Sequence, residues 1–478
     1  MRTATVPAGS PAPGAAGPVD PALAEQRHAR RTLALAGLAV LVIFLDTTVL
    51  FVAFPAISAS FPSAGPATLS WVLNAYTIAF AALLVPAGKI ADRLGHKRIF
   101  LLGSATFTLA SMACALAPTV EVLVAFRVVQ AIGAAALIPA SMALVLRAFP
   151  PAKVPVALAI WGAMGAAAGA VGPTLGAFLV DVATWRWVFL INVPAGILTG
   201  IAGRRVLRES SDPSSRIPAL PGVVLIAAAA SLVSLAVVQG DEWGWTSGRT
   251  AGTLAAGAVL LVAFVAHQRR TAAPALDLSL FAIRNFSWAN AATFAFGIAF
   301  TAMFFGSYLF LTQVWGWSVI RAGLGISPGP LLVALLAPLM GRLAGRIGQR
   351  PLLVAGGLAF AAGGASRLLL LDGASHYAGA YLPGVLLTGL GVALCLPQLS
   401  SVTAQALPPN RLGVGGAVNQ AVRQLGGTIG VALTIALIGR PAGLTEAMAG
   451  FDDVWVVLVA GGLLTSALVL PLRTRRTA

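Results

Sequence analysis

The feature that most constrains this chain is a series of long apolar runs. Between Leu33 and Leu470 there are fourteen of them, most long enough to form a helix across a bilayer core of roughly 30 Å. Only 10% of the residues are charged and 58% are hydrophobic, whereas a soluble domain carries roughly 25% charged residues. The runs are continuous rather than alternating, which excludes an outer-membrane barrel. The sequence therefore predicts an all-α membrane protein with fourteen transmembrane helices.

Charge predicts how these helices are oriented. The chain has 31 Lys and Arg against 15 Asp and Glu, and most of the basic residues fall in the short gaps on one side of the bundle. The positive-inside rule then places both termini in the cytoplasm and the protein, multi-pass, in the cytoplasmic (inner) membrane. Arg367 is one of the few basic residues expected at the outer edge. No basic stripe with interleaved aromatics lies outside the runs, so we expect no nucleic-acid partner.

Neither a metal site nor catalysis is indicated. Cys114 and Cys395 lie in separate apolar runs, and the four histidines form no ligand cluster. The only Gly-Lys pair, Gly88-Lys89, lacks the pattern of a phosphate-binding loop, and no motif places a nucleophile beside a base. We therefore expect no metal, no cofactor and no enzymatic activity, and any transport must be driven without ATP.

An internal repeat predicts the domain organisation. The segment from Gly88 to Gly95, GKIADRLG, recurs from Gly341 to Gly348 as GRLAGRIG, each after the second apolar run of a block of six. Two parallel six-helix halves are the repeat pattern of major facilitator transporters. The predicted parts are a disordered cytoplasmic tail (1–31), an N-terminal half (32–208), a two-helix insert (209–273), a cytoplasmic amphipathic helical segment (274–287), a C-terminal half (288–472) and a cytoplasmic tail (473–478).

Five motifs in the same order carry a family resemblance over nearly the whole chain. They are LDTT followed by Pro55, the loop Gly88–Arg98, RVVQ from Arg127, GPTLG from Gly172, and WRWVFLINVP from Trp185. With them the chain resembles the fourteen-span drug:proton antiporter family of the major facilitator superfamily, typified by EmrB and QacA. The resemblance implies a major facilitator fold of 6 + 2 + 6 helices, and export coupled to protons.

The first repeat is identified as the family's signature loop. The resemblance implies that it locks one conformational state, with Asp92 near the N-terminal end of a helix from the other half, beside Arg411. The alternative is a solvated loop charge. Gly345 stands at the Asp92 position of the second copy, which argues against a second lock. The residues assigned to the lock are Gly88, Asp92, Arg93, Gly95 and Arg98.

A stripe of small residues follows in the fifth run. The glycines from Gly162 to Gly176 are spaced 3, 4, 3 and 4 residues apart, on one helix face that another helix can approach closely. Pro173 leaves the Gly169 carbonyl without a donor, so a bend is expected there. The stretch resembles the antiporter motif, assigned to Gly165, Gly169, Gly172, Pro173 and Gly176, and plain helix packing is the alternative for the glycines.

Asp46 is the only carboxylate placed deep in an apolar run. A charge at the bilayer centre costs about 2.5–3.5 kcal/mol on insertion scales, so such a residue is a functional candidate. At 1.5 Å per residue, Asp46 and Arg127 both lie about 20 Å from the cytoplasmic end and could meet. Arg cannot release its proton, so the hypothesis makes Asp46 the proton carrier, tuned by Arg127 and contested by a cationic drug. A static buried ion pair is the alternative.

Polar and aromatic residues inside the runs are candidate substrate contacts, because a cavity that mixes them suits amphiphilic cations. Packing roles are the alternative for each. Phe51 departs from the family, which usually has Asn at that position. For Arg423 two alternatives stay open, a side chain that faces an inner vestibule and one that bonds to a neighbouring helix. The candidates are Asn74, Tyr76, Gln130, Trp161, Tyr308, Gln313 and Gln398, with Asn290 and Phe305 beside them.

The function predicted from these features is proton-coupled export of drugs or antibiotics by alternating access. A dedicated exporter of one endogenous metabolite or antibiotic is the alternative within transport. A membrane-embedded transferase would need clustered carboxylates or histidines, and a channel would need neither the buried charges nor the glycine-proline stretch. The expected partners are a small-molecule substrate, protons and membrane lipid. Two six-helix halves already form a complete cavity, so we expect a monomer.

Overall fold

The structure is a computed structural model that describes residues 21–150, 153–212, 217–407, 412–439 and 441–473. Within these ranges the regular secondary structure is entirely helical. Thirteen helices are long and apolar enough to cross a membrane, and a bent pair inside α5 brings the number to fourteen. The predicted class, a helical membrane protein with about fourteen spans, is confirmed.

The first six spans form one group of packed helices. Within it α1 packs on α5, α2 and α3 pack on α4, and α3 also packs on α7. A break at Ile191 divides the sixth span into α6 and α7. The helices are α1 (Pro21–Ser60), α2 (Pro66–Leu94), α3 (His96–Ala115), α4 (Val120–Ala148), α5 (Val154–Val182), α6 (Trp187–Leu190) and α7 (Asn192–Val206).

The last six spans repeat this packing. Helix α11 packs on α16, α13 and α14 pack on α15, and α14 also packs on α17. The first and fifth, second and fourth, third and fourth, and third and sixth spans therefore pair in both groups, which is the arrangement that the sequence repeat predicts. The elements are α11 (Arg284–Gln313), α12 (Val319–Ile326), α13 (Pro328–Ile347), α14 (Gln349–Leu370), η3 (Tyr377–Tyr381), α15 (Leu382–Gln405), α16 (Leu412–Ile438) and α17 (Leu444–Val469).

Both copies of the repeated segment make the same turn. Gly95 separates α2 from α3 with φ +109°, and Gly348 separates α13 from α14 with φ +85°. Residues with a Cβ rarely adopt such φ values, so glycine is required at both turns. A Cβ on Gly95 would also lie 2.5 Å from the Glu209 carboxylate. The glycine therefore permits both the turn and the close approach of the chain that follows α7.

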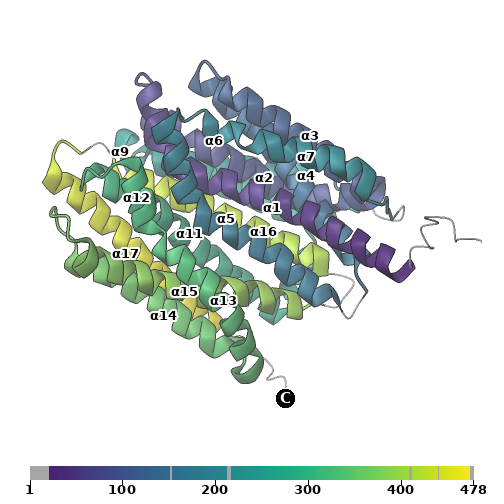
Figure 1. The fold of residues 1–478 in the computed structure, drawn as a ribbon. Helices are drawn as coiled ribbons and strands as arrows, with labels where there is room; N and C mark the ends of the chain where they lie inside the picture. The colour runs from purple at the N-terminus through teal and green to yellow at the C-terminus, as the bar shows by residue number, and fades with distance from the viewer. Residues whose placement is uncertain (1–20, 151–152, 213–216, 408–411, 440, 474–478) are drawn as a thin grey trace, which may run out of the picture.

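The two groups meet along several helix pairs. Figure 1 shows the N-terminal helices in purple to blue on one side and the C-terminal helices in green to yellow on the other. Contacts join α2 to α16, α5 to α12 and α13, and α1 to α11. Among the described residues two hydrogen bonds cross this boundary, between the hydroxyls of Thr77 and Thr428 at 2.9 Å and of Thr174 and Ser327 at 2.8 Å.

The segment between the two groups contributes α8 (Leu220–Val238), α9 (Gly240–Trp243) and α10 (Gly248–Arg270). Helix α8 packs on α10 and also touches α2 and α16, one helix from each group. The amphipathic helix expected over 274–287 is only a short 3-10 helix, η2 (Leu278–Ala282). The Asp277 carboxylate accepts a hydrogen bond from the Ser279 amide at 3.0 Å, and this local turn takes the place of the first turn of an α-helix.

Candidate functional site

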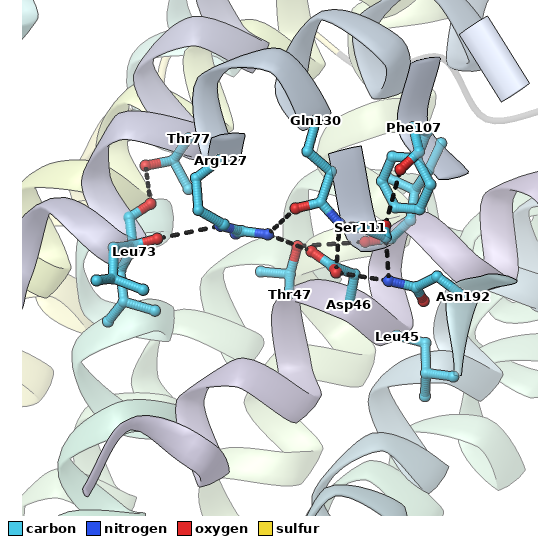
Figure 2. A network of polar contacts seen from close by, with 12 residues as sticks. Leu45, Asp46, Thr47, Leu73, Thr77, Phe107, Ser111, Arg127, Gln130 and Asn192 are labelled. Atoms are coloured by element: carbon cyan, nitrogen blue, oxygen red, sulfur yellow. Dashed lines mark hydrogen bonds and ion pairs between the residues drawn. The ribbon is translucent and has the colours of Figure 1, made fainter. Parts of the chain in front are cut away.

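The buried carboxylate of Asp46 lies at the centre of a polar cluster (Figure 2). It is 2% exposed and is the only acidic residue in the described part of the chain that is buried. Its Oδ2 accepts a hydrogen bond from Arg127 Nη1 at 2.6 Å. Its Oδ1 accepts from Gln130 Nε2 and from Asn192 Nδ2, each at 2.8 Å. The predicted meeting of Asp46 and Arg127 is confirmed.

Arg127 is held in place by several contacts besides the carboxylate. Its Nε donates to the Val72 carbonyl at 3.1 Å, and Nη1 also donates to Gln130 Oε1 at 2.5 Å. The guanidinium carbon lies 4.0 Å from the centre of the Tyr76 ring and 5.8 Å from that of Phe189. Arg127 and Gln130 are three residues apart on α4, so they project from the same face of the helix.

Two members of the cluster were not predicted from the sequence. Ser111 accepts a hydrogen bond from Gln130 Nε2 at 2.8 Å, and it donates its own hydroxyl to the Phe107 carbonyl. Asn192 lies at the first residue of α7, directly after the break at Ile191. The WRWVFLINVP motif could have pointed to Asn192, because this residue is the one side-chain amide in a mostly apolar stretch. Gln130 was expected to contact substrate, but its side chain is fully used within the cluster.

This arrangement compensates two charges that would otherwise be costly to bury. An isolated buried ion pair rarely repays its desolvation, but further hydrogen bonds to both partners improve the balance. Here both carboxylate oxygens have partners, and the guanidinium makes three hydrogen bonds through Nε and Nη1. Because every donor to Asp46 comes from α4 or α7, protonating the carboxylate weakens contacts that join α1 to both helices. The cluster can therefore link a proton to the positions of helices.

The other candidate substrate contacts do not converge on one place. Asn74 donates to Ser234 of α8 at 3.0 Å, and Trp161 donates to Ser141 at 3.1 Å. Tyr308 and Gln398 are buried in α11 and α15. Gln313 is exposed at the C-terminal end of α11. Of the seven residues, only Tyr76 and Gln130 join Asp46 and Arg127.

The remaining polar candidates have neighbours that their sequence context did not reveal. Asn290 Oδ1 accepts from Asn419 at 3.2 Å, inside the C-terminal group. Arg423 is half-buried, bonds to Gln420, and lies with its guanidinium carbon 5.5 Å from the ring centre of Phe44 on α1. Phe51, at the position where the family usually has Asn, packs on the rings of Phe304 and Phe305 across the boundary between the groups.

The signature loop is tied mainly to the segment that connects the two groups of helices. The Asp92 carboxylate lies 3.0 Å from His96 Nε2, and its backbone carbonyl accepts from the Asp212 amide. The Glu209 carboxylate accepts from the backbone amides of Lys97 and Arg98, each at 3.0 Å. Arg93 and Arg98 are exposed, and Gly88 faces Pro139 of α4. Arg411, the expected partner of Asp92, lies outside the described residues.

Only part of the glycine stripe of α5 packs against another helix. A Cβ added to Gly165, Gly172 or Gly176 would press on Phe44, Thr48 or Val49 of α1, whereas one on Gly162 or Gly169 would meet nothing within 4 Å. Three of the five glycines therefore allow close packing on α1, and the other two do not. The helix bends by 41° between Gly169 and Val171, where Pro173 predicts it.

In the described part of the chain no group of three His, Cys, Asp or Glu could hold a metal ion. Cys114 and Cys395 are both buried and free. The side chains of the Asp46 cluster offer one carboxylate, one guanidinium and neutral donors around them.

Comparison with known proteins identifies the family. The model of the Major Facilitator Superfamily matches residues 36–431. The chain belongs to this superfamily. It is therefore a membrane transporter, and the resemblance that the five motifs carry is confirmed by its relatives. The comparison with solved structures supports the fold alone. The structure of a D-xylose-proton symporter matches with a TM-score of 0.67 at 14% identity, and the match covers 94% of this chain and 98% of the symporter chain.

Three relatives of this major facilitator protein are informative. Multidrug resistance protein Stp of Mycobacterium tuberculosis is 38% identical over 84% of this chain and 74% of its own length. Cephamycin export protein CmcT of Amycolatopsis lactamdurans is 34% identical over 94% of both chains. Multidrug export protein EmrB of Escherichia coli is 30% identical over 85% of this chain and 79% of its own. All three names describe export or resistance.

Proposed function

We propose that this protein exports drugs or antibiotics from the cell in exchange for protons, by alternating access. The observation that carries the proposal is the Asp46 cluster: a single buried carboxylate, paired with an arginine that cannot release its proton. The names of the relatives support export as the direction and drugs or antibiotics as the cargo, which we take to be amphiphilic or cationic small molecules. The protein then acts in the cytoplasmic membrane, with both termini in the cytoplasm, as a monomer.

In the proposed cycle Asp46 takes a proton from the outside and loses it to the cytoplasm. The arrangement of the cluster fits the ionised carboxylate, because all three groups that bond to it are donors. Protonation removes the charge that holds Arg127 and weakens the contacts from α4 and α7. The two groups of helices then rearrange along α2–α16 and α5–α12, where they meet. A cationic substrate favours the ionised form and so drives the proton off.

The signature loop and α5 have supporting roles in this proposal. Gly88, Asp92, Arg93, Gly95 and Arg98 hold the cytoplasmic end of one state, and the bend in α5 lets that helix move against α1 and α12. Tyr76 acts on the site through Arg127, whose guanidinium lies over its ring. Asn74 and Trp161 instead hold neighbouring helices together by hydrogen bonds.

Transport in inverted membrane vesicles tests this function. Their lumen corresponds to the cell exterior, so a lumen made acidic should drive a cationic dye such as ethidium inward. Vesicles with the protein should take up dye several-fold faster than vesicles without it, and collapsing the gradient should remove the difference. If no dye enters but another compound releases protons from the lumen, the cargo is narrower than proposed. If no compound does so, the antiport proposal is wrong.

A further inference from the structure

A second buried arginine lies in the C-terminal group of helices. Arg367 lies near the C-terminal end of α14, at the edge of its span as the sequence predicts, and is only 1% exposed. Its Nη2 donates to Thr388 Oγ1 at 3.3 Å, whereas Nε and Nη1 have no hydrogen-bond partner. In the described part of the chain Arg367 takes part in no ion pair. A buried guanidinium without an acid is costly, so its surroundings are informative.

Two aromatic rings lie against the Arg367 guanidinium, and one of them carries a further unpaired donor. The guanidinium carbon lies 5.1 Å from the ring centre of Trp455 and 5.7 Å from that of Tyr381. The ring faces compensate part of the charge. Trp455 is fully buried, and its Nε1–H has no partner. Two guanidinium nitrogens, and the N–H of an indole ring that the guanidinium contacts, are thus left without an acceptor in the described part of the chain.

The N-terminal group shows what is missing. Its arginine cluster draws on the first, third, fourth and sixth spans, through Asp46, Ser111, Arg127 and Asn192. The C-terminal cluster draws on the third, fourth and sixth spans, through Arg367, Thr388 and Trp455. The N-terminal arginine has a carboxylate within hydrogen-bond distance, and the C-terminal one does not. The unpaired donors around Arg367 are therefore open to an acceptor from outside the described chain.

The backbone around Arg367 is built to leave it room. A Cβ on Gly384 would lie 2.9 Å from Arg367 Cγ and 3.3 Å from Nε, so only glycine fits beside the side chain. The preceding segment, η3, is a π-helix that carries Tyr381 onto the cluster. Such π-helical turns are frequent at functional sites. Tyr381 also donates its hydroxyl to the Ser307 carbonyl at 3.4 Å, which fixes the ring.

We propose that Arg367 and Trp455 form a binding site for a small monovalent anion. The guanidinium provides the charge and two N–H donors, and the indole provides a third donor. The shared chemistry is one negative charge on a small acceptor. It has two sources, a free ion of the medium such as chloride, or the carboxylate group of a transported compound. The site does not depend on proton coupling at Asp46.

Thermal unfolding of the purified full-length protein in detergent tests the site without measuring transport. Chloride is titrated against gluconate at constant ionic strength, and acetate is titrated in a parallel series. The unfolding midpoint of the wild type should rise and saturate with chloride, with acetate, or with both. Saturation by chloride identifies a free ion as the occupant, and saturation by acetate alone identifies a carboxylate.

Two variants and a control locate the effect. Trp455→Phe keeps the ring and removes the donor, so the half-saturating concentration should rise roughly tenfold, as expected for one hydrogen bond to a charged group. Arg367→Gln should abolish the saturation. Trp187→Phe, on an exposed tryptophan, should match the wild type. If Arg367→Gln does not fold, Trp455→Phe decides alone. A wild type without saturable response, or a Trp455→Phe response equal to that of the wild type, overturns the proposal.

Discussion

At the scale of single residues, Arg127 combines a charge with a specific hydrogen-bonding geometry. Its Nε and Nη1 bond to three acceptors at once, on Val72, Asp46 and Gln130, while its face stacks on Tyr76. A guanidinium can do this because its donors are fixed in one plane, whereas a lysine ammonium is a single point. The same residue therefore holds α4 against α1 and α2.

Arg127→Lys should consequently lose most transport even though it keeps the positive charge. Losing one charge-assisted hydrogen bond costs about 1.5–3 kcal/mol, which corresponds to about a tenfold or greater loss of rate if the bond is needed throughout the cycle. Gradient-driven dye uptake, normalised to the amount of folded protein, is the measurement. Arg249→Lys, at an exposed position on α10, is the control. Uptake equal to the wild type would show that charge alone suffices.

At the scale of elements, the α1–α5 contact depends on three of the five α5 glycines. Gly172 lies against the Thr48 side chain so closely that a Cβ has no room, whereas Gly162 has open space. Thr48 also donates to the Ala168 carbonyl at 3.3 Å, which ties the two helices at the same level. The spacing of the glycines alone did not separate these two kinds of position.

Gly172→Ala and Gly162→Ala should therefore differ in stability. Overpacking of a close helix contact costs about 1–3 kcal/mol, so Gly172→Ala should lower the thermal unfolding midpoint. Gly162→Ala should leave it unchanged or raise it slightly, since alanine favours a helix by up to about 1 kcal/mol over glycine. Equal midpoints for the two variants would contradict the packing described for α5.

The turn between α2 and α3 is a second element whose geometry requires glycine. Gly95→Ala combines an unfavourable φ with a clash against Glu209, so it should destabilise the protein by at least about 1–2 kcal/mol. Gly65→Ala, at a position with φ −69° and no atom within 4 Å, is the matched control. The measurement is the unfolding midpoint of each variant in detergent. A Gly95→Ala midpoint equal to that of Gly65→Ala would contradict the requirement for glycine at this turn.

At the scale of the whole molecule, alternating access requires the two groups of helices to move against each other while each stays rigid. The Thr174–Ser327 hydroxyl pair joins α5 to the residue between α12 and α13, across the boundary, at 2.8 Å. The Ser104–Thr199 pair, at 2.7 Å, joins α3 to α7 inside the N-terminal group. The oxygen–oxygen distances of the two pairs are nearly the same. Only the Thr174–Ser327 pair has to separate when the two groups of helices move against each other.

Disulfides at these pairs should therefore have different effects on transport. Thr174→Cys with Ser327→Cys, once oxidised, should stop dye uptake, and a reductant should restore it. Ser104→Cys with Thr199→Cys should transport to a similar extent in both redox states. Cross-linking yield is measured alongside uptake, with Cys114 and Cys395 replaced by alanine. Full transport by the oxidised Thr174/Ser327 pair would contradict motion at this boundary.

The sequence predicted those features that depend on patterns along the chain. Apolar runs predicted the spans, the repeated loop predicted two equivalent groups of helices, and Pro173 predicted the bend in α5. Asp46 and Arg127 could be paired because depth in a helix is read directly from residue count. Asn192 and Ser111 could not be added in this way, because their roles depend on how α7 and α3 approach α1. Arg367 lies near the end of its span, as expected, but its burial could not be predicted, because burial depends on how α15 and α17 pack against that end.

The central claim is that Asp46 couples transport to protons, and one measurement tests it most directly. Dye uptake into inverted vesicles is compared with and without an acidic lumen, for the wild type, Asp46→Asn and Asp453→Asn, the last being an exposed carboxylate on α17. Unfolding midpoints of the purified proteins establish that each variant is folded. The account predicts that the gradient accelerates uptake by the wild type and Asp453→Asn and has no effect on folded Asp46→Asn. Equal acceleration of Asp46→Asn and the wild type would contradict it, and would leave the Asp46–Arg127 pair as a brace between helices.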